Sequence, residues 1–152
     1  MQNRLNADVN IVLFCCWLAY RGAGTSNLAK YLAGALKLSR EWQRNLIEPL
    51  RTGRKNVKDM VDNGAIALTE QSDALAIAER VKQCELDLEQ LQNAALYALV
   101  IDGSDEGVTR APAEQKDDAR NNLTVYFAAM NIKLDPLGET HVMRILTAVF
   151  GG

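Results

Sequence analysis

The segment from residue 70 to residue 101 constrains the fold more than any other part of the 152-residue chain. Apolar side chains recur in it every seven residues over four heptads, and they predict the seam of one long helix. Two lines make up this seam: Ala74, Val81, Leu88 and Ala95 in one, and Ile77, Cys84, Leu91 and Ala98 in the other. The seam indicates antiparallel packing in a bundle or a self-associating coiled coil. Further leucines beside the seam widen the apolar surface, which favours the bundle.

A second segment, residues 8–21, predicts the core helix of that bundle. It contains the ten-residue apolar run "IVLFCCWLAY", which Asn6 or Asp8 can cap and Gly22 and Gly24 can end. Because roughly 20 apolar residues are needed to cross a bilayer, the run is too short for a membrane anchor. A helix that is apolar nearly all round must instead be covered by protein on several sides.

The next two segments also show helical spacing rather than the alternation of a strand. We expect a second helix at about 26–37 and a third at 39–60, with Ser39 as the N-cap of the third. Pro49 should kink or split that helix, because proline lacks the backbone donor and clashes with the preceding turn.

The last third of the chain contains the clearest predicted loop, residues 102–112. Pro112 and Pro136 each suit the first turn of a helix that follows. The prediction is therefore an all-α protein, a single-domain bundle of about five or six helices over residues 1–152, with one long central helix at about 70–101.

Composition places the chain among ordinary globular proteins, with 48% apolar and 24% charged residues. The first residues do not form a signal peptide, which favours a cytoplasmic location. The net charge of -2 hides an asymmetry, because residues 1–58 carry +7 and residues 59–118 carry -10. Such an asymmetry serves partner binding or lays one part of a bundle against another.

The three cysteines do not form a disulfide framework, which again fits a reducing compartment. Cys15 and Cys16 are expected to be buried free thiols, since adjacent side chains on a helix diverge by about 100°. The alternative is a thiol-dependent enzyme in which Cys15 or Cys16 is the nucleophile and His141 the base. His141 is the only histidine, so a histidine-based metal site is excluded, and we predict neither a metal nor a cofactor.

Basic residues in the third predicted helix form the strongest surface pattern. They lie at intervals of seven, four and three residues on one helical face, with Arg40 and Arg54 close by. This face suits phosphates or a nucleic-acid backbone, or it pairs with the acidic long helix that carries Glu79, Glu85, Asp87 and Glu89. A pI near 5.4 and the scarcity of interleaved aromatic residues favour protein contacts over nucleic acid. The candidate ligand or partner surface is Trp17, Trp42, Arg44, Arg51, Arg54, Lys55 and Lys58.

The stretch "NADVNIVLFCCWLA" at 6–19, then Trp42, then "EPLRTGRKNVK" at 48–58 resembles an uncharacterised proteobacterial family of short helical proteins. The matching residues are Val9, Asn10, Phe14, Cys15, Trp17, Leu18, Trp42, Pro49, Leu50, Arg51 and Arg54. The resemblance implies a helical fold and brings no activity or catalytic residue. Family members generally have an additional amphipathic segment before this point. This chain begins at the residues "MQNRL", which resemble the end of that segment, so either Met1 is a genuine internal start or the chain is shortened. If the segment is missing, the first helix should leave apolar surface for another subunit to cover.

These observations predict a non-enzymatic protein-interaction or assembly module that works through helical surfaces, with self-association, such as a homodimer, or a protein partner. No membrane association is predicted, and the sequence assigns no small molecule. One alternative is an anion, phosphate or nucleic-acid binder that uses the basic face of helix 39–60. The other is the thiol-dependent enzyme described above.

Overall fold

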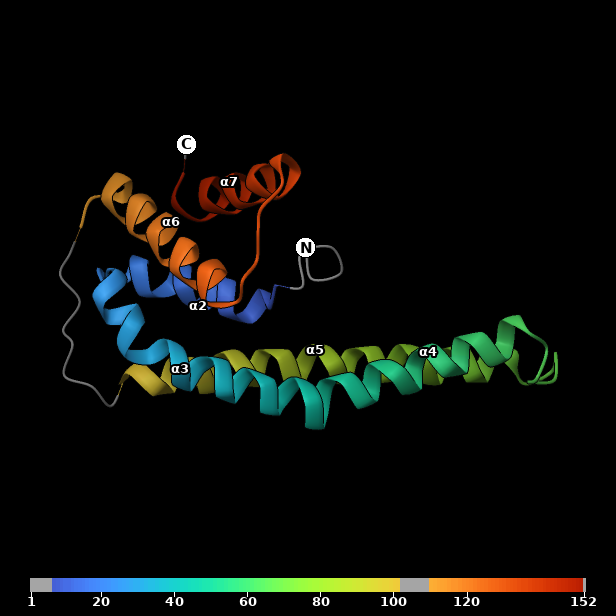
Figure 1. The fold of residues 1–152 in the computed structure, drawn as a ribbon. Coiled ribbons are helices and arrows are strands. Elements are labelled where there is room, and N and C mark those ends of the chain that lie inside the picture. Colours follow the sequence, from blue (N-terminus) through green and yellow to red (C-terminus); the bar gives the residue numbers. More distant parts are fainter. Residues whose placement is uncertain (1–6, 102–109, 152) are drawn as a thin grey trace. The chain divides into compact units, whose positions relative to one another are not determined.

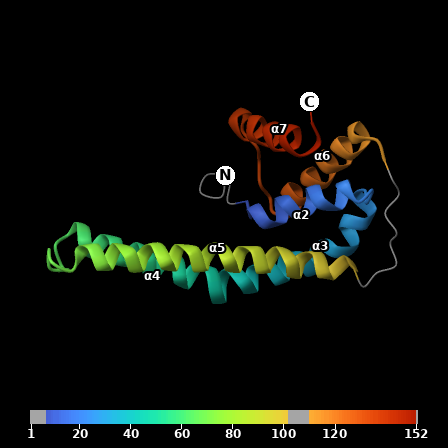
Figure 2. The ribbon, with the colours of Figure 1, turned by 180° about the vertical axis from the view of Figure 1, so that it is seen from behind.

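The computed structural model describes residues 7–101 and 110–151, and within these ranges the chain is helical without a strand. The α-helices are α2 (Val9–Tyr20), α3 (Thr25–Trp42), α4 (Glu48–Asp62), α5 (Gln71–Ile101), α6 (Pro112–Ala129) and α7 (Pro136–Phe150), as Figures 1 and 2 show. A π-helical turn, η1 (Gln43–Ile47), joins α3 to α4. The all-α prediction and the long helix are confirmed. Most of the predicted loop, residues 102–109, lies outside the described residues.

The helices divide into two compact units. The first contains the chain up to Ser39 and again from Leu96 onward, and the second contains Arg40–Ala95. Helices α3 and α5 each contribute residues to both units. The assignment of the whole chain to one domain stays a prediction.

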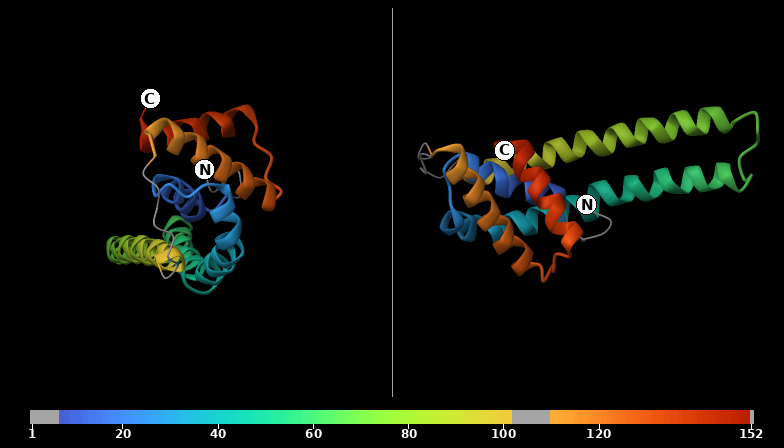
Figure 3. Two further views of the ribbon diagram at one scale, coloured as in Figure 1. Left: turned by 90° about the vertical axis from the view of Figure 1, so that its left-hand side faces the viewer. Right: turned by 90° about the horizontal axis from the view of Figure 1, so that it is seen from above.

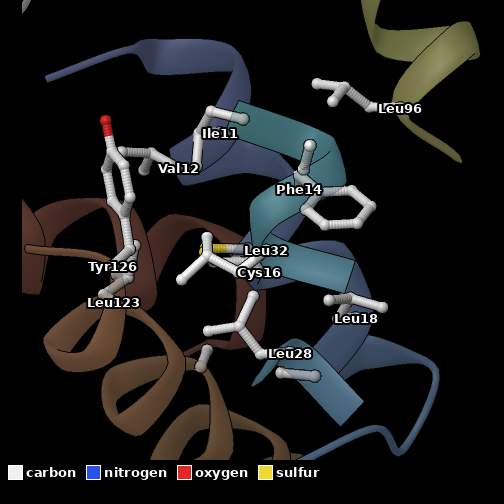
Figure 4. Close-up of a cluster of buried hydrophobic side chains, with 14 of the residues drawn as sticks. Ile11, Val12, Phe14, Cys16, Leu18, Leu28, Leu32, Leu96, Leu123 and Tyr126 are labelled. Carbon is white, nitrogen blue, oxygen red and sulfur yellow. The ribbon is translucent and has the colours of Figure 1, made fainter. Parts of the chain in front are cut away.

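The core of the first unit surrounds α2, and Figure 4 shows its buried side chains. Phe14 and Leu18 on α2, Leu28 on α3 and Leu123 on α6 are almost completely buried. Helix α6 packs against α2, and α7 packs against α6. This chain's own residues bury eight of the twelve α2 side chains, while Val9, Leu13 and Tyr20 are exposed. That another subunit covers the exposed part of this helix stays a prediction.

Polar contacts hold the ends of α2 in place. Asp8 caps the helix by accepting a hydrogen bond from the backbone N–H of Asn10 at 2.8 Å. The backbone N–H of Asp8 donates to Tyr126 Oη, also at 2.8 Å. Near the other end, Asn122 Nδ2 on α6 donates to the carbonyl oxygens of Cys15 and Ala23. These contacts tie two distant parts of the sequence together.

Ser39 does not cap a third helix, because α3 continues through it to Trp42. Its hydroxyl is buried and donates to the carboxylate of Asp8. Because the Ser39 hydroxyl donates to Asp8, it does not compete for hydrogen bonds with the helix backbone, and the serine is tolerated inside the helix. The break predicted at Pro49 is confirmed as a π-turn that ends just before α4. Pro49 then lies in the first turn of α4, where its missing donor costs little.

The second unit is an antiparallel helical hairpin, in which η1 and α4 run beside α5 and the chain turns at Gly64, with φ of +76°. Figure 3 shows the two helices side by side along the length of the unit. Side-chain contacts set the register: Gln43 Nε2 donates to Gln92 at 3.2 Å, and Arg54 Nε donates to Glu85 at 2.5 Å.

The seam of α5 differs from the predicted one in its second line. The first predicted line, which includes Val81 and Leu88, is half-buried. The second predicted line is not buried within the chain, because Ile77, Cys84, Leu91 and Ala98 are all exposed. Ala78, Glu85 and Gln92 are buried in their place, one residue further along in each heptad. Glu85 and Gln92 are polar, so a count of apolar side chains misses them. They lie in the seam because Arg54 and Gln43 satisfy their hydrogen bonds.

Candidate functional site

The two predicted tryptophans belong to different units. Trp17 is half-buried in the first unit, where its ring stacks on Tyr97 with centroids 4.5 Å apart. The guanidinium of Arg21 lies 5.1 Å from the centroid of the same ring. Trp42 is half-buried at the end of α3, in the second unit.

Two of the predicted basic residues, Arg51 and Arg54, converge on the carboxylate of Glu85. Arg54 donates to both of its oxygens, and Arg51 Nε lies 3.6 Å from one of them. Arg51 also pairs with Glu89 at 3.1 Å and with Glu48 at 2.8 Å. The hydrogen bond to Glu85 raises the pKa of Arg54. These guanidinium groups are therefore paired with carboxylates of the acidic long helix. Pairing with this helix is one of the two roles that the sequence indicated for them.

The other predicted cations, Arg44, Lys55 and Lys58, are exposed. At 100° per residue, Lys55 and Lys58 lie on the same side of α4 as Arg51, which contacts Glu89. Arg44 precedes them in the π-helical turn. We call this side of the hairpin the charged face. It also carries two exposed leucines of α5, Leu75 and Leu86.

The opposite side of the hairpin carries a line of apolar residues along each helix, and we call it the apolar face. Its members are Leu46, Gly53 and Met60 along η1 and α4, and Ile77, Cys84 and Leu91 on α5. On α5 these residues are seven apart and form one straight stripe about a quarter-turn from the seam, as do Gly53 and Met60 on α4. Leu46 precedes Gly53 by seven residues and lies in the π-helical turn η1. Both stripes lie on the same face because each is on the far side of its helix from the contact between Arg51 and Glu89.

The apolar face is open to solvent within the chain. Leu91 is 58% exposed and Ile77 46%, and Leu46 and Met60 are exposed to a similar degree. A Cβ atom added to Gly53 would meet nothing within 4 Å. Scattered apolar residues are normal on a protein surface, but two aligned lines of exposed apolar residues make this side of the hairpin a candidate interaction surface. The heptad spacing was visible in the sequence, where it predicted a buried seam.

The thiols predicted to be buried are buried and free. Cys15 is 0% exposed and Cys16 2%, whereas Cys84 is exposed on the apolar face. Burial raises the pKa of Cys16 to about 11 and raises the pKa of Cys15 further. Because the thiolate is the nucleophilic form, these surroundings disfavour the thiol-enzyme hypothesis. His141, the base in that hypothesis, is half-buried on α7.

A pocket in the first unit lies between α6 and α7 and was not foreseen from the sequence. Its volume is about 330 Å³, and its lining includes Phe127, Leu134 and Val142 with Arg120 and Glu139. It lies near the lower end of the range typical of small-molecule sites. None of the predicted site residues lines it.

The helices and this surface together define an all-α protein whose second unit is a hairpin with one apolar and one charged face. The chain belongs to the family described as "Protein of unknown function (DUF2390)", which matches residues 1–96. That range includes the "EPLRTGRKNVK" motif and nearly the whole hairpin. Searches of curated proteins and of solved structures found no match to the chain. Among the residues that the structure describes, no helix is long and apolar enough to span a membrane.

Proposed function

We propose that this protein is a non-enzymatic interaction module that binds protein through the apolar face of its helical hairpin. The observation that carries the proposal is the pair of exposed, heptad-spaced stripes on the same side of α4 and α5. A helix pair that buries only one seam leaves these side chains in water, and covering them gains roughly 25 cal/mol per Å² of apolar area removed. A partner that presents apolar helical side chains at the same spacing fits this face.

The charged face is a weaker candidate. A phosphate or nucleic-acid site there would depend on Arg44, Lys55 and Lys58, because Arg51 and Arg54 are already paired with carboxylates. Glu89 lies along the same side, and its carboxylate lowers the local positive potential. We also propose a cytoplasmic location, since buried free thiols such as Cys15 and Cys16 fit a reducing compartment.

The experiment is fluorescence-detected sedimentation of the labelled full-length chain, in buffer and in concentrated bacterial extract. The chain should sediment in extract as a complex heavier than its own 16.8 kDa mass. The double variant Ile77→Glu with Leu91→Glu should sediment as the monomer, because two carboxylates on the apolar face oppose its burial.

The matched control is Leu75→Glu with Leu86→Glu, on the charged face. These leucines are 45% and 44% exposed, close to the value for Ile77, so the control adds the same charges to α5 at similar exposure. It should sediment in extract with the complex, as the wild-type chain does. A wild-type chain that sediments as a monomer in extract, or an equal effect of the two double variants, would overturn the proposed function.

A further inference from the structure

We infer that the occupant of the apolar face is the same face of a second copy of this chain, with the two α5 helices antiparallel across a twofold axis. This inference rests on the proposed function and names its partner. Three features of the hairpin support it: the register of the two stripes, the sizes of their side chains, and the charges beside them.

The register places the six apolar residues in three layers. The contacts of Gln43 with Gln92 and of Arg54 with Glu85 set the register, and the mean of the two places Gly53 and Cys84 at about the same height along the hairpin. Each stripe then extends seven residues in either direction. Leu46 therefore lies level with Leu91, and Met60 level with Ile77.

The side-chain sizes are symmetric about the central layer. Gly53 and Cys84 are small, and the residues seven positions away on either side are large: Leu46, Met60, Ile77 and Leu91. An isologous interface requires that a patch match itself after a twofold rotation. When the axis passes through the central layer, Leu91 meets Ile77 of the second copy and Leu46 meets Met60 of the second copy. The two small residues meet their own copies, which lets the helix backbones approach there.

The charges beside the apolar stripe of α5 are also matched to a second copy. Arg80 and Asp87 are exposed on its outer edge, four residues before Cys84 and three after it. In the antiparallel arrangement Arg80 lies beside Asp87 of the second copy, and the twofold axis generates the same pair again. Two reciprocal ion pairs therefore border the apolar contact. A partner unrelated to this chain would not account for charges placed on both sides of the same centre.

The test is sedimentation equilibrium of the purified full-length chain at concentrations up to about 100 µM. We expect twice the 16.8 kDa chain mass. Arg80→Asp should weaken the dimer by roughly three- to tenfold, because each of two exposed ion pairs becomes a repulsion. The charge-swapped double variant Arg80→Asp with Asp87→Arg should return the dissociation constant to within about twofold of the wild-type value. Both positions are exposed, so these variants leave the interior unchanged.

A purified chain that stays monomeric over this range would overturn the inference. A double variant that dimerises as weakly as Arg80→Asp alone would also overturn it, because the reciprocal pairing would then be absent. If the purified chain is a monomer while the chain in extract forms a complex that requires Ile77 and Leu91, this inference fails and the proposed function stands. A monomer under both conditions rejects both.

Discussion

The guanidinium of Arg54 donates to both carboxylate oxygens of Glu85, with Nε 2.5 Å and Nη2 3.2 Å from their acceptors. Glu85 is only 4% exposed, so an ionised side chain occupies the centre of the hairpin seam. Burying a charge is costly unless its partners are held beside it. The pair therefore fixes which residues of α4 face α5, and in doing so places the two apolar stripes together on one side of the hairpin.

Replacing Glu85 should destabilise the hairpin more than any replacement at its edge. In Glu85→Ala, Arg51 and Arg54 keep their charges and lose their shared partner. We expect a loss of about 2–3 kcal/mol in the free energy of unfolding, below the range for fully buried pairs because both arginines are partly exposed. Urea denaturation followed by circular dichroism measures it. Glu79→Ala is the control, since its side chain is 73% exposed, and it should cost less than about 0.5 kcal/mol. Equal losses in the two variants would show that the ion pair does not hold the seam.

The contact between Ser39 and Asp8 should behave as one coupled unit of the first core. Asp8→Ala removes both the cap of α2 and the acceptor of the Ser39 hydroxyl, so it should cost about 2 kcal/mol, and Ser39→Ala about 1 kcal/mol. A double-mutant cycle from urea denaturation should give a coupling energy of about 1 kcal/mol. Thr124→Ala is the control. It removes an exposed hydroxyl on α6 that donates to the carbonyl oxygen of Arg120, and it should change the free energy of unfolding little. Additive losses from Asp8 and Ser39 would mean that their hydrogen bond contributes nothing to folding.

The three thiols should differ sharply in their reactivity. Cys84 is exposed, whereas Cys15 and Cys16 are buried with raised pKa values. A small aromatic disulfide reagent at pH 8, with the protein at low micromolar concentration, should therefore label one thiol quickly. It should label the other two only after urea is added. Cys84→Ala is the control and should remove the fast phase completely. Rapid labelling of all three thiols would contradict the buried core and revive the thiol-enzyme hypothesis.

The buried thiols should also make stability depend on pH in the alkaline range. The pKa of Cys16 rises from its ordinary value of 9.0 in the unfolded chain to about 11 in the folded protein. Above pH 9 the unfolded chain loses this proton while the folded protein keeps it, so the stability that is complete below pH 9 falls as pH approaches 11. We expect a loss of roughly 1 kcal/mol per thiol between pH 8 and pH 10, measured by urea denaturation. In Cys16→Ala the free energy of unfolding should fall less steeply with pH. An identical slope would show that burial does not raise the pKa of Cys16.

The sequence allowed the elements to be predicted more reliably than the contacts between them. The core helix predicted at 8–21 is observed at Val9–Tyr20, and the long helix at 70–101 is observed at Gln71–Ile101. These elements follow from local spacing and helix ends. Ser39 was assigned to a helix N-cap because serine usually caps, and only the tertiary contact with Asp8 shows why it lies inside α3.

The candidate surface shows the same limit. Apolar spacing identified Ile77, Cys84 and Leu91 as a line, but it could not show that Glu85, beside them, is the residue that faces α4. That choice depends on Arg54, 31 positions away in the sequence, and so on a contact that no local pattern contains. The arginines drew attention in the sequence as a basic surface, and in the structure two of them are part of the hairpin seam.

The most direct measurement of the central claim is oxidative cross-linking at Cys84 in the purified full-length chain. The twofold arrangement places the two Cys84 side chains opposite each other, so mild oxidation at about 100 µM protein should give a covalent dimer within minutes. Cys84→Ala with Leu75→Cys moves the exposed thiol to the charged face and should stay monomeric under the same conditions. A Cys84 cross-link that is no faster than the Leu75→Cys cross-link would contradict the docking of two apolar faces.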